Sequence, residues 1–392
     1  MPLKHFDQAG KLYGKTVLLR VDFNVPVKGR KVIDSYKIKK SLTTIKDLSE
    51  KGAKVVVVSH LGRPVRLDAK LSLKPVAEEL SKFLQKKIPL LGISDLVKTK
   101  NLIHKLNPGS IAMLENIRFL RGEIENSTNL AEDLAGLADI FVLDGFAVAH
   151  RNAASVSGIA RFLPAYTGNL LQAEVEGLDR VIKNPKKPLV AILGGIKMET
   201  KIPVLKNLLK RADYILVGGG IVNTYLWAKG NKVGSSIIDK NFKKEILEYC
   251  SKKKIILPID VVVGPANGKK AYVLPIKNLS LKKDVGIFDI GPQSIKLFSK
   301  YIKKAKTLVW NGAMGNFEQH PYQYGTYSMA HLLASQSKQK AFGVAGGGET
   351  IEVLQKLGVL GDVDLPSTGG GSMLEYLAGN TLPGLDALKN KF

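Results

Sequence analysis

Short, continuously apolar segments that end in glycine or polar residues constrain the fold of this chain more than any other feature. Segments with helical periodicity lie between them, such as SLKPVAEELSKFLQKK at 72–87. Strands that are apolar along their whole length are buried on both faces, which is typical of parallel sheets covered by helices. We therefore predict an α/β protein whose ligands bind beyond the carboxyl ends of its strands. The predicted strands include TVLLRVDFN at 16–24, KVVVVSHLG at 54–62, DIFVLDGF at 139–146, LVAILGG at 189–195, YILVGGG at 214–220 and IILPIDVVVG at 255–264.

Chain length and one long helical segment predict two domains. The chain has 392 residues, and domains usually hold about 100–200 residues. The stretch at 162–188 separates two sets of strands and contains a helix over about 168–183. A helix that joins two α/β domains would leave a cleft between them. We place the N-terminal domain at residues 1–165, the joining helix at 166–185 and the C-terminal domain at 186–377.

The amino-acid composition limits which kinds of molecule the chain is expected to bind. Lys and Arg number 59 and Asp and Glu 34, so the net charge is +25 and the chain attracts anions. The lysines are spread along the sequence without zinc-finger spacing or aromatic RNA-binding motifs, which makes nucleic acid a minor hypothesis. A single cysteine, Cys250, excludes a disulfide framework, and no apolar run reaches the roughly 20 residues of a membrane span. With no signal-peptide pattern at the N-terminus, we expect a cytoplasmic protein without membrane partners.

Glycine-rich segments that follow predicted strands of the second half suit a phosphorylated ligand. ILGGIKMETKIP at 192–203 places Lys197 and Lys201 at the start of a helix, which we expect to begin near 200–203. Backbone N–H groups and the helix dipole favour phosphate there. LVGGGIVNTYL at 216–226 leaves bare backbone against which a flat ring can lie. Each segment alone is also explained by a tight βα turn with solvated side chains.

Two further segments complete this pattern. VWNGAMGNFE at 309–318 supplies Asn311, together with Glu318 as a hydrogen-bond acceptor for a ribose. AGGGETIE at 345–352 is followed by LPSTGGGSMLEYL at 365–377, a second helix N-terminus that suits an anion.

Glu349 stands where a carboxylate would repel phosphate. Mg²⁺ prefers one or two carboxylates together with substrate phosphates, so a cation between the two groups would remove the repulsion. We expect Glu349 to reach the Mg²⁺ of a nucleotide and Thr350 to contact phosphate. Taken alone, Glu349 is better explained as a first-turn acid favoured by the helix dipole. The four glycine-rich segments together favour the nucleotide.

Cations follow the predicted strands of the first half. Arg63, Arg118 and Arg151 come after separate strands and would lie on one rim. Several such side chains suit a small, highly charged substrate, because Arg binds carboxylate and phosphate through paired N–H bonds. Asp22 and Asn24 could bind a hydroxyl group of that substrate. A nucleotide site in one half and an acidic-metabolite site in the other predict phosphoryl transfer. The cations are Arg20, His60, Arg63, Arg118, Arg121, His150 and Arg151.

The sequence motifs resemble those of phosphoglycerate kinase, in order and over essentially the whole chain. The resemblance implies two Rossmann-like parallel-sheet domains that face each other across a cleft, with a C-terminal tail, 378–392, packing back on the first domain. It implies a glycolytic monomer that transfers a phosphoryl group reversibly, with Mg²⁺, between ATP and the carboxylate of 3-phosphoglycerate, giving 1,3-bisphosphoglycerate and ADP. The motifs are VLLRVDFNVP, SHLGRP, LENIRF, DGFAVAHR, LGGIKMETKI, VGGGIVNTYL, LPID, WNGAMGNFE, GGGET and STGGGSMLEYLAG.

The same resemblance implies site residues. Lys197 would follow the transferred group, and Gly370 and Gly371 would donate backbone N–H groups to it. For 3-phosphoglycerate, it implies Asp22, Asn24, His60, Arg63, Arg118 and Arg151, with Lys37 beside them. For MgATP or MgADP, it implies Gly195, Lys201, Gly219, Gly220, Asn311, Glu318, Gly347, Gly348, Glu349 and Thr350, with Glu349 reaching the metal.

The chain departs from the family's pattern at several positions. Lys37 stands where the family usually has Arg, and Lys keeps the charge but loses the planar fork, so we expect slow turnover. Ala153 replaces a common His, Glu349 replaces the usual Asp, and Ala313 replaces Pro.

Two other functions remain as alternatives. A dehydrogenase with two Rossmann-like halves would need G-x-G-x-x-G after an early strand and an acid about 20 residues on, and the sequence has no such unit. A non-catalytic, basic nucleotide- or nucleic-acid-binding protein is the second alternative. GKLYGKT at 10–16 is not a P-loop, because Ala9 stands where the motif needs glycine and the segment precedes a strand.

Overall fold

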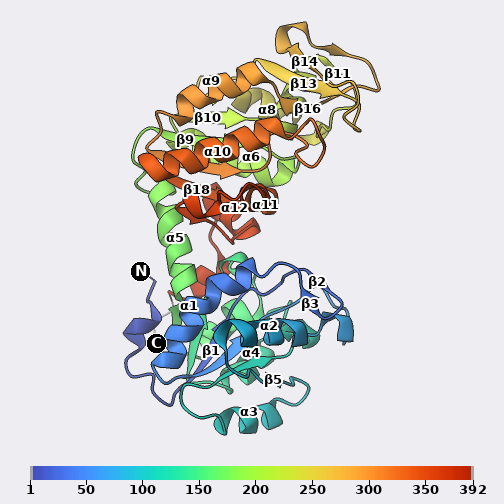
Figure 1. Cartoon of the computed structure of the whole chain (residues 1–392). Coiled ribbons are helices and arrows are strands. Elements are labelled where there is room, and N and C mark those ends of the chain that lie inside the picture. Colours follow the sequence, from blue (N-terminus) through green and yellow to red (C-terminus); the bar gives the residue numbers. More distant parts are fainter. Residues whose placement is uncertain (1–2, 390–392) are drawn as a thin grey trace. The chain divides into compact units, whose positions relative to one another are not determined.

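The computed structural model describes residues 3–389 and divides the chain into two compact α/β units (Figure 1). Unit 1 comprises Met1–Val175 and Thr381–Phe392, and unit 2 comprises Glu176–Asn380. Residues 1–2 and 390–392, which belong to the predicted N-terminal domain and tail, lie outside the described residues. The long helix α5 (Asn169–Ile182) contributes its first half to unit 1 and its second half to unit 2.

A six-stranded parallel sheet forms the centre of unit 1. Its order is β5-β6-β4-β1-β7-β8, and residues 17–19 of β1 and 55–58 of β4 are fully buried. The strands are β1 (Thr16–Arg20), β4 (Lys54–Val58), β5 (Leu90–Leu91), β6 (Ile111–Leu114), β7 (Ile140–Leu143) and β8 (Ala165–Thr167); a small antiparallel hairpin adds β2 (Val27–Lys28) and β3 (Lys31–Val32). The helices are α1 (Tyr36–Glu50), α2 (Lys74–Leu84), α3 (Leu96–His104), α4 (Thr128–Ala135) and α13 (Pro383–Ala387).

Unit 2 repeats this plan with a second six-stranded parallel sheet, ordered β12-β10-β9-β17-β18-β19. Its strands are β9 (Leu189–Leu193), β10 (Tyr214–Val217), β12 (Ile255–Ile256), β17 (Thr307–Asn311), β18 (Phe342–Gly346) and β19 (Leu365–Pro366). Its helices are α6 (Met198–Arg211), α7 (Gly219–Ala228), α8 (Lys243–Cys250), α9 (Pro292–Ile302), α10 (Tyr324–Gln339), α11 (Gly348–Lys356) and α12 (Gly371–Ala378). The predicted α/β class with parallel sheets is confirmed.

The segment 255–264 is not the single strand that the sequence predicts. It breaks into β12 and β13 (Asp260–Gly264), and β13 joins a separate antiparallel sheet of order β14-β13-β16. Pro258 lies in the break, and proline cannot donate a backbone hydrogen bond to a neighbouring strand. The other strands of the sheet are β14 (Tyr272–Pro275) and β16 (Gly286–Ile290), and a two-stranded sheet pairs β11 (Lys232–Val233) with β15 (Ser280–Leu281).

Helix α6 begins at Met198, two residues before the predicted start. Its N-cap is Lys197, and Pro203 therefore lies inside the helix rather than at its first position. Lys201 lies in the first turn of the helix, on its buried side at 6% exposure. Within residues 3–389, no helix has the length and apolarity to cross a membrane.

Phe298 of α9 offers a test of the packing of unit 2. Its side chain is fully buried in the core beneath β9 and β17. We expect Phe298→Ala to lower the free energy of unfolding by about 3–5 kcal/mol, because it leaves a cavity. Both tryptophans, Trp227 and Trp310, lie in unit 2, so their fluorescence in urea follows this unit.

The exposed Lys300 on the same helix supplies the control. Lys300→Ala should change the free energy of unfolding by less than about 0.5 kcal/mol. Equal decreases in the free energy of unfolding in the two variants would contradict the burial of Phe298 in this core.

Candidate active site

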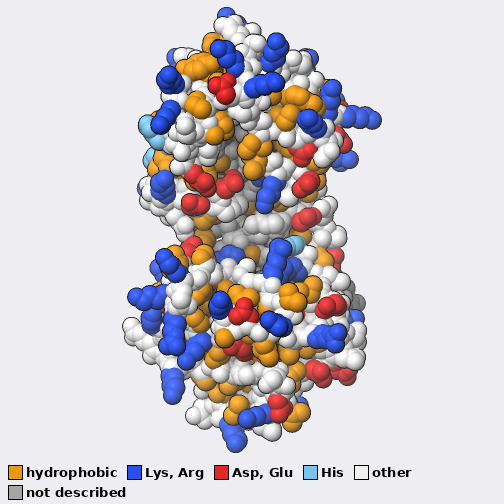
Figure 2. Space-filling view, turned by 90° about the vertical axis from the view of Figure 1, so that its right-hand side faces the viewer, with side chains coloured by type: hydrophobic (Ala, Val, Ile, Leu, Met, Phe, Trp, Pro, Cys, Tyr) orange, Lys and Arg blue, Asp and Glu red, His pale blue; other side chains and the backbone are white. Residues whose placement is uncertain are grey.

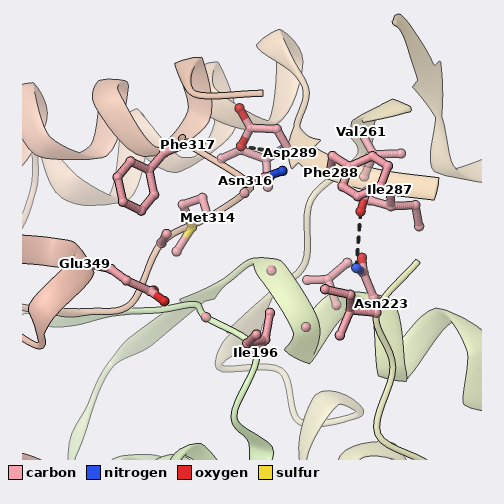
Figure 3. A pocket seen from close by; sticks show the side chains of 18 of the residues that line it. Ile196, Asn223, Val261, Ile287, Phe288, Asp289, Met314, Asn316, Phe317 and Glu349 are labelled. Carbon is pink, nitrogen blue, oxygen red and sulfur yellow. Dashed lines mark hydrogen bonds between the residues drawn. The ribbon is translucent and has the colours of Figure 1, made fainter. Parts of the chain in front are cut away.

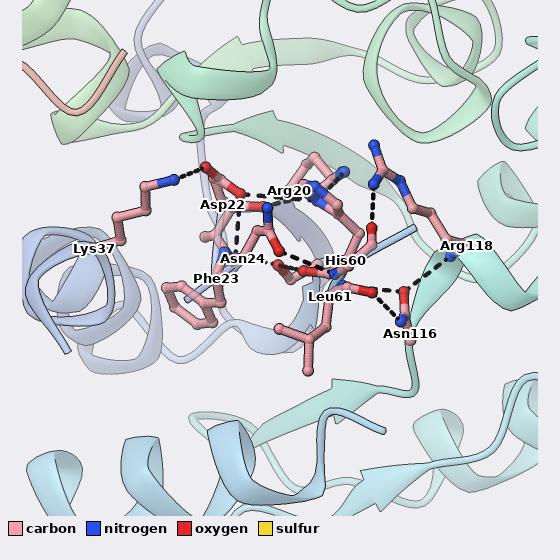
Figure 4. A network of polar contacts seen from close by, with 12 residues as sticks. Arg20, Asp22, Phe23, Asn24, Lys37, His60, Leu61, Asn116 and Arg118 are labelled. Atoms are coloured by element: carbon pink, nitrogen blue, oxygen red, sulfur yellow. Dashed lines mark hydrogen bonds and ion pairs between the residues drawn. The ribbon is translucent and has the colours of Figure 1, made fainter. Parts of the chain in front are cut away.

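Polar side chains from three separate segments of unit 1 meet at the carboxyl edge of its sheet (Figure 4). Asp22 follows β1, His60 follows β4, and Lys37 lies in the first turn of α1. The Asp22 carboxylate accepts a hydrogen bond from Lys37 Nζ at 2.6 Å, and its other oxygen lies 3.8 Å from His60 Nδ1. Asn24 Oδ1 accepts a hydrogen bond from the Gly62 N–H at 3.0 Å. The structure thus brings Asp22, Asn24, Lys37 and His60 together, and their binding of a substrate stays a prediction.

Arg20 is a member of this cluster that the predicted site omits. It is the last residue of β1, and its side chain is only 2% exposed. Arg20 Nε donates to Ser155 Oγ at 2.9 Å, and Ser155 Oγ donates to Glu123 Oε1 at 2.6 Å. Burial lowers the pKa of Arg20, and the charge of Glu123 opposes that shift. Arg20 is among the cations that follow the predicted strands of the first half, but the family resemblance does not include it among the substrate ligands.

Three more arginines complete the cationic surface. Arg118 lies in a short 3-10 helix, Ile117–Phe119, and donates a hydrogen bond to the Gly62 carbonyl. Burial, followed by the charges of Arg151 and Arg20, lowers its pKa to about 10. Arg151 Nε is buried without a hydrogen-bond partner among the described residues, whereas Arg63 is exposed. The charges therefore repel one another, and a bound anion would relieve that repulsion.

The environment of His60 disfavours its charged form. Its side chain is 1% exposed, and burial, followed by the neighbouring Arg20 and Arg118, lowers its pKa well below the usual range. Its Nε2 atom is buried without a hydrogen-bond partner in the described chain. The lowered pKa favours the neutral imidazole, which can donate one N–H hydrogen bond to an anion.

A pocket of about 360 Å³ lies in unit 2 where β9, β10 and β17 end (Figure 3). Of the predicted residues, Gly195, Gly219, Gly220, Glu318 and Glu349 line it. Gly219 has φ +56°, and a Cβ atom there would lie 2.9 Å from the Gly195 backbone nitrogen. Glycine at position 219 therefore lets the loops after β9 and β10 pack closely against each other.

Apolar side chains form the walls of this pocket. Met314 and Phe317 come from the loop after β17, and Val261 and Ile287 come from the antiparallel sheet. Figure 3 shows Phe317 and Glu349 on one side of the cavity, with Val261 and Ile287 opposite. The sequence does not predict these residues as pocket walls, because an apolar side chain in a strand or loop gives no signal that separates a pocket wall from the core.

Three predicted residues lie beneath the pocket rather than on its wall. Lys201 Nζ donates a hydrogen bond to Asn311 Oδ1, and Asn311 Nδ2 donates to the Gly346 carbonyl at 2.7 Å. Thr350 is fully buried, and its hydroxyl accepts a hydrogen bond from the Gly312 N–H at 2.9 Å. Asn311 and Thr350 thus hold neighbouring loops in place, and contact of Thr350 with phosphate stays a prediction.

The remaining predicted residues are at helix starts. Lys197 is exposed at the N-cap of α6, and Gly370 is the N-cap of α12, followed by Gly371 at its first position. Gly347, with φ +97°, is the N-cap of α11, and Gly348 is exposed beside it. None of these residues lines the pocket of 360 Å³. The N-termini of these three helices suit an anion outside the pocket.

The protein has parallel sheets in two α/β units, with a glycine-lined pocket in one unit and a cationic cluster in the other. These features are typical of proteins that bind phosphorylated ligands. Comparisons with known proteins are more specific. A profile of the family "Phosphoglycerate kinase" matches residues 7–380. The phosphoglycerate kinase of Pelotomaculum thermopropionicum is 42% identical over 386 residues, which cover 96% of this chain and 97% of the relative. That of Rhizobium meliloti is 40% identical over 400 residues and covers 100% of both chains.

Solved structures agree with this match. The phosphoglycerate kinase of Coxiella burnetii has a TM-score of 0.87 and 38% identity and covers 99% of both chains. That of Pyrococcus horikoshii OT3 has a TM-score of 0.86 and 32% identity, covering 99% of this chain and 98% of the other. The chain belongs to the phosphoglycerate kinase family. It is a transferase, EC 2.7.2.3, whose function is glycolytic phosphoryl transfer, and the predicted family and activity are confirmed.

Lys201 should make nucleotide binding depend on pH. Burial lowers its pKa to about 8, and the charge of Glu349 partly opposes the shift. Lys201 is charged below this pH and loses its charge above it, so affinity for the nucleotide phosphates should fall about tenfold between pH 7 and pH 9. Calorimetric titration with MgADP at a series of pH values measures this change.

Lys201→Arg is the informative variant, because Arg stays charged throughout this range. The Lys201→Arg variant should lose most of the decrease in MgADP affinity between pH 7 and pH 9. Lys206→Arg, at an exposed position of the same helix, should leave that decrease unchanged. An unchanged pH dependence in Lys201→Arg would show that another group titrates.

Proposed function

We propose that unit 1 binds 3-phosphoglycerate and that unit 2 binds MgATP or MgADP. The observation that carries the first assignment is the convergence of Arg20, His60, Arg118 and Arg151 at one sheet edge. Burial and mutual repulsion favour a small anion there. The proposed ligands of 3-phosphoglycerate are Asp22, Asn24, Lys37, His60, Arg63, Arg118 and Arg151, to which the structure adds Arg20.

The pocket of unit 2 supports the assignment of the nucleotide. Its apolar walls suit a purine ring, its glycines allow close approach, and Glu318 is an acceptor for a ribose hydroxyl. The charge of Lys201 lies beneath the start of α6, where phosphates would come closest to backbone N–H groups. In this assignment, Lys201 and Asn311 lie beneath the pocket and support the nucleotide site from there. Gly347, Gly348 and Thr350 form the part of the site that holds the phosphates.

The donor set of unit 2 fits Mg²⁺ that is carried mainly by the nucleotide. The described residues contain no group of three His, Cys, Asp or Glu side chains that could hold a metal without it. Glu349 lines the pocket as an exposed carboxylate, and Mg²⁺ commonly takes one or two carboxylates plus phosphate oxygens. Glu349 would therefore hold the ion, which would neutralise negative charge on the phosphates.

To catalyse this reaction, the protein has to align the two substrates and stabilise the charge on the moving group, and it does not have to transfer a proton. The accepting carboxylate has an ordinary pKa of about 3.5 and is ionised at neutral pH, so it needs no general base. Lys37 and Lys197 would stabilise the moving phosphoryl group, and the N–H groups of Gly370 and Gly371 would contact its oxygens. Transfer requires the two bound substrates to meet and water to be excluded, because water would otherwise accept the phosphoryl group. We propose that the enzyme acts in the cytoplasm as a monomer.

A coupled assay of ADP formation tests this function directly. ADP should form from ATP only when 3-phosphoglycerate and Mg²⁺ are both present. Formation of ADP without 3-phosphoglycerate, or no formation with it, would contradict the proposal and favour a non-catalytic nucleotide-binding protein.

Lys197 should act on the transition state more than on binding. We expect Lys197→Ala to lower kcat about 10²–10³-fold, because one charged donor to the moving group is lost, and to change the KM for ATP much less. Lys206→Ala, also at an exposed position of α6, is the control and should leave both constants unchanged. A rise in KM alone would assign Lys197 to ground-state binding.

Lys37 should limit the rate through its geometry. Its ammonium group is held by Asp22 at 2.6 Å and makes one point contact, whereas Arg would offer a planar fork. We expect Lys37→Arg to raise kcat several-fold, with Lys46→Arg, an exposed change on the same helix, as the control. Steady-state kinetics measure the change, and an unchanged kcat would refute this role for Lys37.

A further inference from the structure

Unit 2 concentrates positive charge at the amino-terminal edge of its parallel sheet. Because the strands are parallel, the turns that precede them all lie at this edge, opposite to the strand ends that form the nucleotide pocket. Five adjacent strands, in the order β12, β10, β9, β17 and β18, each follow a turn with at least two Lys or Arg residues. The turns are 251–254, 210–213, 183–188, 303–306 and 338–341, and we name them together the lysine edge.

The lysine edge is almost free of acids. Its five turns hold thirteen Lys and Arg residues and a single acid, Asp213. All twelve lysines are exposed. Among the described residues, three of the thirteen cations form an ion pair: Lys183 with Asp179 at 2.7 Å, Lys187 with Asp213 at 3.2 Å and Lys338 with Asp362 at 2.8 Å. The other ten have no carboxylate within 4 Å in this part of the chain.

Direct contacts show that the turns are neighbours. Lys187 Nζ donates a hydrogen bond to the Arg211 carbonyl, and Lys254 Nζ donates to the Leu209 carbonyl at 3.2 Å. The Lys306 N–H donates to the Pro188 carbonyl at 2.9 Å. Neighbouring strands lie about 4.8 Å apart, so the five turns extend along about 19 Å of the sheet edge.

A row of cations, most of which have no carboxylate partner among the described residues, fits a linear polyanion. Lys is a compact point charge that binds phosphate without the bidentate geometry with which Arg reads bases. The lysine edge contains a single Arg. We propose that the lysine edge binds the phosphate backbone of nucleic acid without sequence preference. This function is separate from phosphoryl transfer, because it uses the opposite edge of the sheet.

The chemistry of the edge favours nucleic acid over a membrane surface. Stable attachment to a bilayer usually combines lysines with inserted apolar side chains or a lipid. None of the exposed large apolar residues within 3–389 lies in the five turns. Along the sequence the lysines are spread out, which makes nucleic acid a minor hypothesis there, whereas the sheet order brings five clusters into one row. Figure 2 shows that Lys and Arg side chains are also scattered over one face of the molecule, so the test needs a control for general charge.

Fluorescence anisotropy of the full chain with a labelled 25-nucleotide RNA of mixed sequence tests the proposal. We expect binding at 50 mM KCl that weakens with salt, with a slope of log K against log salt of about −3 for four or five contacted phosphates. A quintuple variant with Lys252, Lys253, Lys254, Lys303 and Lys304 changed to Gln should bind at least about tenfold more weakly and with a shallower slope.

The matched control removes five exposed lysines of the same unit, around β14 and β15. Lys269, Lys270, Lys277, Lys282 and Lys283 changed to Gln should bind RNA within about twofold of the unaltered protein. Both variants should keep full kinase activity, which also shows that they are folded. No RNA binding at 50 mM KCl, equal losses in the two variants, or tighter binding to phosphatidylserine vesicles than to RNA would each overturn the proposal.

Discussion

Burial of the parallel strands on both faces is the constraint on which the rest of this structure depends. A strand such as β1 or β4 can carry only apolar side chains where helices cover both sides of the sheet. Polar and charged groups are therefore confined to the two edges. The carboxyl edges hold the cation cluster of unit 1 and the pocket of unit 2, and the opposite edge of unit 2 holds the lysines.

Arg20 is the exception that shows how strong this constraint is. Its guanidinium is buried at the last position of β1, and the structure surrounds it with Ser155, Glu123 and Asp22. Buried charges persist only when they are paired and hydrogen-bonded. The arrangement therefore fixes a cation beneath the proposed acceptor site, and Arg118 and Arg151 add charges that are only partly compensated. A phosphorylated acid bound there would balance the positive charge that the protein's own side chains leave uncompensated.

The sequence predicts the alternation of strands and helices and the polar residues directly after each strand, because both follow from periodicity and from parallel topology. It predicts Asp22, His60 and Arg118 near one another for this reason. It does not predict that Asn311 and Thr350 are buried beneath the pocket, because their orientation depends on contacts with Lys201 and Gly312 from other segments.

Long-range packing also explains what the sequence misses. Val261 and Ile287 form part of the pocket wall and belong to a separate antiparallel sheet. In the sequence, the segment 255–264 is predicted as a single strand, so this separate sheet is not expected. The sequence also does not predict the row of lysines, because the row depends on the order of five strands in the sheet.

A crystal structure with both substrates bound would test these site assignments directly. We expect the phosphorylated acid against Arg20, His60, Arg118 and Arg151 in unit 1, and the nucleotide in the glycine-lined pocket of unit 2. Density for both ligands within one unit, or a cation cluster that stays empty at saturating 3-phosphoglycerate, would contradict these assignments.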